Sequence, residues 1–190
     1  MCVIAVAERQ LTDDEITRMF VRNPHGAGYM FARGGKVHIR KGFMTPAELI
    51  ESVRSEGITS ERVVYHFRFS TQAGVKRSMC HPFPLSRTLK HQELLNVGCQ
   101  IGVAHNGVIP CTSDPQENRY SDTALFVSQV MSWIIRKPEQ IHDRSKLDKI
   151  TEIAGKYNKF AIMDGSGSVE LIGDFTEVDG ILVSNTYWRW

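Results

Sequence analysis

The second residue of the chain combines the two groups that an N-terminal nucleophile requires. Cys2 follows the initiator Met1 and begins an apolar, strand-like run that ends at Ala7. Once Met1 is removed, Cys2 carries both a thiol and a free α-amine, whose ordinary pKa of about 7.7–8.0 lets it accept the thiol proton near neutral pH. The alternative is a buried, inert thiol, because free cysteines are commonly core residues. The choice depends on what the fold places around Cys2.

Three short polar motifs stand at the ends of expected strands or at the start of an expected helix: Arg-Phe-Ser-Thr at 68–71, His-Asn-Gly at 105–107 and Ser-Asp-Thr at 121–123. Singly, they are most simply explained as a surface charge, a turn and a helix cap. Read with Cys2, they form a coherent set. A guanidinium holds a carboxylate, an aspartate holds an ammonium group, and an asparagine amide beside a glycine N–H stabilises an oxyanion. Such a set fits a free α-amino acid with an attackable side-chain amide, and glutamine is the obvious candidate.

Periodicity predicts the elements that must position these residues. Strands are expected at 2–7, 29–33, 36–41, 63–69, 101–104, 159–163, 169–172 and 180–184. Helices are expected after a capping box at 12–15, from 45 to about 55, over 122–136 and over 147–154. Prolines at 82 and 84 are expected to forbid regular structure, 176–179 to form a turn, and the aromatic tail at 187–190 to pack on the sheet. Helices and antiparallel-type strands in blocks favour an α+β layered domain.

Size and composition limit the class of protein. The 190 residues are 42% hydrophobic and 23% charged, which suits one globular domain spanning 1–190. The formal net charge is +2 with both signs interspersed, so neither nucleic acid nor a membrane is expected as a partner. The sequence has no secretory-type start and no run of roughly 18 apolar residues, so a cytoplasmic location is expected. Its cysteines and histidines do not repeat a zinc pattern, and we expect neither a metal nor a cofactor.

The order of motifs resembles that of the class II glutamine amidotransferase domains, which belong to the N-terminal nucleophile hydrolases. The matching pieces occupy the first two thirds of the chain in the family's order: Cys2, Gly-Ala-Gly at 26–28, residues 66–71, His-Pro at 81–82, residues 103–109 and 121–123. The resemblance implies a four-layer αββα sandwich with mainly antiparallel sheets. One sheet edge would present the N-terminal cysteine.

The resemblance also implies catalytic roles. Cys2 would be the nucleophile with its own α-amine as the base. Asn106 and the backbone N–H of Gly107 would form the oxyanion hole.

The implied substrate contacts come from other segments. Arg68, helped by Thr71, would bind the glutamine carboxylate, and Asp122 would bind the ammonium group. Arg22 precedes a glycine turn as a family arginine does and would orient the cysteine, while His81 matches a family histidine near the pocket. For Arg22 and His81 a purely structural part is an equal alternative.

Three functions remain open on this reading. The first is a glutaminase subunit that delivers ammonia to a separate synthetase. The second is an amidohydrolase of the same fold that cleaves another γ-glutamyl amide, and the third is an inactive binding or regulatory module. The chain departs from many family members at Val3, where they carry glycine, and at the proline-broken connection 110–115, where they often carry a helix. The loop at 70–78, with Gly74, is expected to close over the substrate.

Overall fold

The computed structural model describes residues 1–58, 61–70, 75–110 and 119–189. Two sheets form its centre. Sheet A has seven strands in the order β10 (Thr176–Val178), β11 (Ile181–Val183), β1 (Val3–Ala7), β4 (Val63–Phe67), β2 (Ala27–Arg33), β3 (Lys36–Phe43) and β6 (Asn96–Cys99). Sheet B has four strands in the order β5 (Phe83–Pro84), β7 (Ile101–Asn106), β8 (Lys159–Asp164) and β9 (Val169–Ile172). Every described strand pair is antiparallel.

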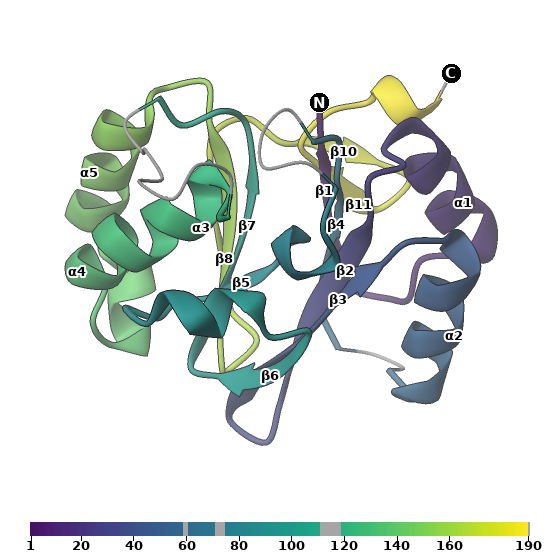
Figure 1. Ribbon diagram of the computed structural model, residues 1–190, viewed down its shortest axis with the longest axis horizontal. Coiled ribbons are helices and arrows are strands. Elements are labelled where there is room, and N and C mark those ends of the chain that lie inside the picture. The colour runs from purple at the N-terminus through teal and green to yellow at the C-terminus, as the bar shows by residue number, and fades with distance from the viewer. Residues whose placement is uncertain (59–60, 71–74, 111–118, 190) are drawn as a thin grey trace.

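Helices cover the outer face of each sheet. Figure 1 shows α1 (Asp13–Arg22) and α2 (Pro46–Ser55) on one side of the molecule, and α3 (Asp122–Phe126), α4 (Ser132–Ile134) and α5 (Arg144–Ala154) on the other. Short 3-10 turns lie at Arg77–Met79, Leu89–Glu93, Pro138–His142 and Tyr187–Arg189. The order of layers is therefore helix, sheet, sheet, helix, and the predicted four-layer αββα sandwich is confirmed.

Three apolar cores separate these layers. The first lies between the α1–α2 layer and sheet A and contains stacked Tyr29 and Phe31. The second lies between the two sheets and includes Ile4 of sheet A and Ala104 of sheet B. The third lies between sheet B and α3–α5 and includes Phe160. Because side chains of a strand alternate between the two faces, β1 and β7 each contribute to a core on both sides.

The local sequence signals predict several element boundaries. Thr12 caps α1 in a capping box with Glu15, and Thr45 accepts a hydrogen bond from the Glu48 N–H at the start of α2. The β2–β3 hairpin turns through glycines at 34–35, both with positive φ. Trp188 of the aromatic tail is buried in the core between α1 and sheet A, whereas Tyr187 is exposed, so the expected packing of the tail is confirmed for Trp188 alone.

Three expectations about local structure were wrong. Phe83–Pro84 does form a short strand, because it lies at the edge of sheet B, where a proline without an N–H is tolerated. Thr176–Val178 is the edge strand of sheet A, and the turn is confined to Asp179 and Gly180, which both have positive φ. The helix expected over 122–136 is divided by a π-helical turn at Val127–Met131 and ends at Ile134, before Pro138.

The helices of the described segments are short. The longest, α5, has 11 residues. None of those described has the length and apolar character needed to cross a membrane.

Candidate active site

Cys2 lies at one end of sheet A, immediately before β1. Val3 is paired with Phe67 of β4, so the antiparallel register places Cys2 opposite Arg68. The side-chain amide of Asn185 donates a hydrogen bond to the Cys2 carbonyl at 2.7 Å. The Cys2 carbonyl is thus held by a residue that follows β11, while its thiol contacts Phe69, which follows β4.

The thiol of Cys2 is in a partly desolvated position. Burial raises the pKa of Cys2, while the Phe69 N–H, which donates to the sulfur at 3.3 Å, and the Arg68 charge both oppose that rise. A thiol with a raised pKa is largely protonated at neutral pH, and the thiolate is the nucleophilic form. Attack by Cys2 therefore requires a base that can take the thiol proton.

Arg68 brings a buried positive charge beside this thiol. Its backbone N–H donates to the Gly26 carbonyl at 2.8 Å, and its carbonyl accepts from the His25 N–H at 3.0 Å. Burial lowers the pKa of Arg68, and Cys80, Cys2 and Asp122 oppose the shift. A guanidinium nevertheless remains cationic in proteins, so Arg68 can bind a carboxylate. Thr71, its expected helper, lies outside the described residues.

A narrow cavity of ≈30 Å³ connects these groups with residues from three other segments. Its lining is Cys2, Arg68, Phe69, Ser70, His81, His105, Gly107, Ser121, Asp122 and Thr123. Of the residues selected from the sequence, the structure brings together Cys2, Arg68, His81, Gly107 and Asp122 in this one place. Asn106 lies next to it.

Asn106 ends strand β7, and Gly107 follows it directly. The Asn106 amide nitrogen donates to the Ser184 hydroxyl at 2.9 Å, and its buried oxygen has no hydrogen-bond partner among the described residues. Gly107 has a φ of 154°, and a Cβ there would lie 2.1 Å from the Asn158 side-chain oxygen. Position 107 therefore requires glycine, because a larger residue would clash with Asn158 where the chain passes from the Asn106 amide to the cavity.

Asp122 begins helix α3 and faces the cavity from the opposite side. One carboxylate oxygen accepts the Ile109 N–H at 2.8 Å, and the other accepts the Thr123 N–H at 2.7 Å. Ser121 caps the helix by accepting a hydrogen bond from the Ala124 N–H at 3.2 Å. The cap fixes the start of the helix, and the two N–H bonds fix the rotamer of the carboxylate. A carboxylate fixed in this way has further lone pairs with which to accept an ammonium group.

Three buried histidines support the wall of the cavity. The rings of His66 and His81 are stacked with centroids 4.1 Å apart, and the rings of His81 and His105 are 6.3 Å apart. Burial lowers the pKa of His66 to about 3, and burial also lowers the pKa of His81 and of His105. The three rings are therefore neutral at pH 7 and serve as hydrogen-bonding and packing groups.

The hydrogen bonds of His105 define its tautomer. Its Nε2 bonds the Asn158 side-chain oxygen at 2.8 Å, and its Nδ1 bonds the Thr123 hydroxyl at 2.7 Å. Because Asn158 offers an acceptor, Nε2 carries the proton and Nδ1 accepts from the hydroxyl. The His105 backbone N–H donates to Nδ1 of His81 at 3.3 Å. This network ties β7, α3 and the His81 segment together around Gly107.

Arg22 is not brought to the cavity. It is exposed in the last turn of α1 and does not line the cavity around Cys2. Its expected role in orienting the cysteine stays a prediction.

Sequence reasoning missed Ser184 and Asn185, which follow β11. The Ser184 hydroxyl accepts hydrogen bonds from the Ile4 N–H and from the Asn106 amide, both at 2.9 Å, and the Lys159 ammonium donates to the Ser184 carbonyl at 2.7 Å. Ser184 therefore connects strand β1 of sheet A, which follows Cys2, with the expected oxyanion residue of sheet B. No local signal marks them, because Ser184 is the last residue of the strand expected at 180–184.

Comparisons with known proteins agree with this architecture. No protein-family model matches the chain, and no curated protein matches it in sequence. Among solved structures, it is similar to a glutamine phosphoribosylpyrophosphate (PRPP) amidotransferase from B. subtilis complexed with ADP and GMP, with a TM-score of 0.54 and 14% identity. A structure of the allosteric regulatory enzyme of purine biosynthesis gives a TM-score of 0.54 and 15% identity. Each match covers 96% of this chain and 41% of the other chain.

The chain has an N-terminal nucleophile hydrolase fold. The resemblance to class II glutamine amidotransferase domains is thus confirmed for the fold. This chain spans about two fifths of the length of the solved chains that it matches, 41% in each case.

Proposed function

We propose that the chain, after removal of Met1, hydrolyses the side-chain amide of glutamine through a thioester on Cys2 and supplies the ammonia to a separate acceptor enzyme. One observation carries the proposal. Cys2, Arg68, Gly107 and Asp122 come from four segments distant in sequence and line the same cavity. The thiol can attack the side-chain amide carbon of glutamine, and the backbone N–H can bind the oxyanion that forms. The cation matches the α-carboxylate of glutamine, and the anion matches its α-ammonium group.

Binding uses the two charged groups. The α-carboxylate of glutamine pairs with Arg68, whose planar guanidinium suits bidentate contact with a carboxylate. The α-ammonium group pairs with Asp122. This arrangement directs the amide of the substrate side chain toward the thiol.

The chemical steps use the groups at the sheet edge. The α-amine of Cys2 takes the thiol proton, and the thiolate attacks the amide carbon. The oxyanion accepts hydrogen bonds from the Gly107 N–H and the Asn106 amide. The amine then gives the proton to the departing ammonia, and water, deprotonated by the same amine, attacks the γ-glutamyl thioester and releases glutamate and the free thiol.

Met1 removal controls whether the base exists. In the chain as printed, the nitrogen of Cys2 belongs to a peptide bond with Met1 and cannot accept a proton. Burial raises the pKa of the Cys2 thiol, so the thiol depends on this base for ionisation. The unprocessed chain is therefore expected to be inactive.

The cavity must also open before an amino acid can enter. Its volume of ≈30 Å³ is close to that of a single water molecule. Phe69 lies on the rim, is 41% exposed and packs on His25 with ring centroids 5.0 Å apart. We expect rim side chains such as Phe69 to move when the substrate binds.

A substrate panel tests the proposal. Met1-free protein is incubated with glutamine, with asparagine and with larger γ-glutamyl amides, and glutamate and ammonia are measured. We expect release from glutamine that is lost in Cys2→Ala and kept in Cys99→Ser, whose cysteine lies on strand β6 away from the cavity. Release only from a larger γ-glutamyl amide would overturn the assignment of glutamine, and no release from any amide would overturn the enzymatic function.

A further inference from the structure

A second cavity lies at the other end of strand β7. Asn106 ends this strand beside Cys2, whereas Ile101 begins it at the second cavity, about 17 Å away along a strand that rises ~3.4 Å per residue. This cavity has a volume of ≈340 Å³ and is lined by Leu85, Arg87, Gln100, Ile101, Ser132, Ile135 and Arg136. It shares no lining residue with the cavity around Cys2.

Two arginines of the second cavity are held in place by the same tryptophan. The Arg87 guanidinium carbon lies 3.8 Å from the centroid of the Trp133 ring, and Nε of Arg136 donates to the Trp133 carbonyl at 3.2 Å. The Arg136 backbone N–H also donates to the Gln140 side-chain oxygen at 2.8 Å. Stacking and hydrogen bonding reduce the freedom of both side chains, so less entropy is lost when they bind a ligand.

Neither arginine is neutralised by a carboxylate in the described part of the chain. Other arginines form ion pairs, for example Arg40 with Glu56 and Arg77 with Glu48, but Arg87 and Arg136 form none there. Among the residues that the structure describes, no acidic one lines the cavity. Two guanidinium groups in one concave site without a carboxylate favour an anionic occupant.

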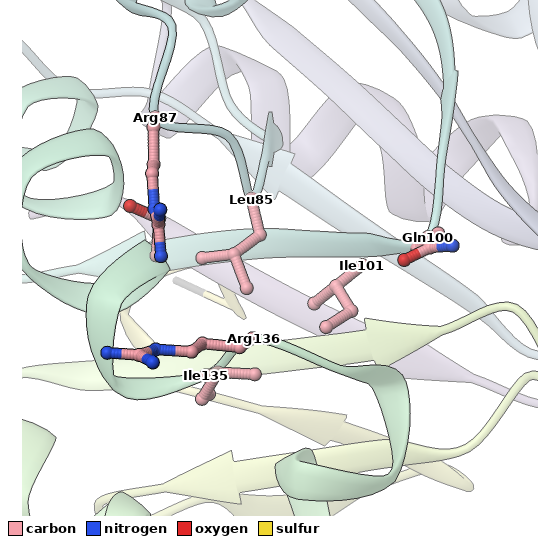
Figure 2. Close-up of a pocket in the computed structure, with 7 residues that line it drawn as sticks. Leu85, Arg87, Gln100, Ile101, Ile135 and Arg136 are labelled. Carbon is pink, nitrogen blue, oxygen red and sulfur yellow. The ribbon is translucent and has the colours of Figure 1, made fainter.

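The remainder of the lining consists of three apolar residues, Leu85, Ile101 and Ile135, and two polar residues, Gln100 and Ser132. Figure 2 shows Leu85, Ile101 and Ile135 in the middle of the cavity, with the guanidinium groups of Arg87 and Arg136 to one side and Gln100 on the other. The volume falls at the lower end of the range of about 300–1,000 Å³ for small-molecule sites. An apolar floor with a few polar groups at its margin is the usual composition of such sites.

We propose that this cavity binds a small anionic molecule in which a phosphate or carboxylate group is joined to a compact apolar portion. The anionic group pairs with Arg87 and Arg136, and the apolar portion covers Leu85, Ile101 and Ile135. The amide of Gln100 lies on the far side of the floor and donates to or accepts from a polar end of the ligand. This inference rests on the second cavity alone and does not depend on the glutaminase proposal.

Calorimetric titration of the full chain with four probes tests the proposal. The probes are phenyl phosphate, 3-phenylpropionate, inorganic phosphate and benzyl alcohol. We expect saturable binding of at least one of the two aryl anions, weaker binding of inorganic phosphate and none of benzyl alcohol. The stronger of the two aryl anions identifies the ligand group as phosphate or carboxylate.

Single substitutions locate the binding site. Arg87→Gln and Arg136→Gln should each weaken binding of the aryl anion about tenfold or more, since each removes charged hydrogen bonds. Arg144→Gln, on the exposed surface of α5, is the control and should leave the affinity unchanged. The two arginines are replaced separately, so if one variant does not fold the other still decides.

Two results would overturn the proposal. One is no saturable binding of either aryl anion at millimolar concentration. The other is an affinity that is unchanged in a correctly folded Arg136→Gln or Arg87→Gln protein, which would place the anion elsewhere.

Discussion

Ser184 is the residue through which the two sheets position the candidate catalytic groups. Its hydroxyl accepts hydrogen bonds from the Ile4 N–H, two residues after Cys2, and from the Asn106 amide. This one oxygen atom therefore positions both strand β1, which follows Cys2, and the Asn106 amide, which is expected to face the oxyanion. We infer that Ser184 acts as a positioning residue, because it does not line the cavity itself.

Replacing Ser184 with alanine should lower kcat more than it changes KM. The alanine variant loses the acceptor for the Asn106 amide, so the amide is no longer fixed for the transition state, and we expect a decrease in kcat of about tenfold or more. Ser184→Thr keeps the hydroxyl and should restore most of the activity. Steady-state glutamine hydrolysis by both variants measures this, and an equal loss in the alanine and threonine proteins would argue against positioning through the hydroxyl.

Replacing Asn106 with alanine tests the oxyanion donor itself. Removal of one such donor typically decreases kcat by about 10²–10³-fold, and we expect a decrease of that order with little change in KM. The control is Asn96→Ala, since Asn96 is an exposed asparagine on the edge strand β6. A full kcat in Asn106→Ala would remove this residue from the mechanism.

Among the elements, β2 approaches the His81 segment so closely that it requires a glycine. A Cβ at Gly28 would lie 2.3 Å from the His81 carbonyl and 2.6 Å from the Lys41 Cβ. Because Gly28 has no side chain, the segment that carries His81 packs directly on β2 of sheet A. His81 in turn lines the cavity around Cys2.

Gly28→Ala should therefore destabilise the protein. Overpacking in a core typically lowers the free energy of unfolding by about 1–3 kcal/mol. The added Cβ would meet the backbone carbonyl of His81, which cannot rotate away as a flexible side chain can. Gly98→Ala is the matched control on β6, where the added Cβ meets only Lys36 Cδ at 4.0 Å, and it should be close to neutral. Urea unfolding measures both variants, and equal stabilities would contradict the close approach.

Several elements were predictable because their signals are local. The capping box at Thr12, the Thr45–Pro46 helix start and the glycine hairpin are each determined by a few adjacent residues. Strand order was not predictable in this way. The residues of β11 are typical of a strand, but nothing local indicates that it pairs with β1 and brings Ser184 near Cys2.

The candidate site was likewise predictable where the signal is local and not where it depends on contacts in the folded chain. Cys2, Arg68, Gly107 and Asp122 were selected because each has side-chain or backbone chemistry that glutamine requires, and the structure places them around one cavity. The supporting contacts of Asn158 and Ser184 could not be selected, because their importance comes only from what they touch in the folded chain.

The stability of the whole molecule should depend on pH through its buried histidines. Burial lowers the pKa of His66 to about 3 and also lowers the pKa of His81 and His105, whereas an unfolded histidine titrates near 6.5. Below about pH 6.5 the unfolded chain binds more protons than the folded one, so the free energy of unfolding must decrease as the pH falls. Each such histidine contributes a slope of at most ~1.4 kcal/mol per pH unit between pH 6.5 and its folded pKa.

Urea unfolding between pH 7.5 and pH 5 measures this dependence. In His66→Gln the slope should be smaller by the contribution of one histidine. A free energy of unfolding that does not change over this range would show that the three rings are not held neutral.

We propose that Met1 removal turns Cys2 into a nucleophile that recognises glutamine. Intact-mass analysis tests it most directly, before and after incubation with a glutamine analogue that carries an electrophilic carbon in place of the amide. We predict a mass without Met1 and one covalent adduct per chain, kept in Cys99→Ser and absent in Cys2→Ala and in protein that retains Met1. An unmodified Met1-free protein, or an adduct that persists in Cys2→Ala, would contradict the account.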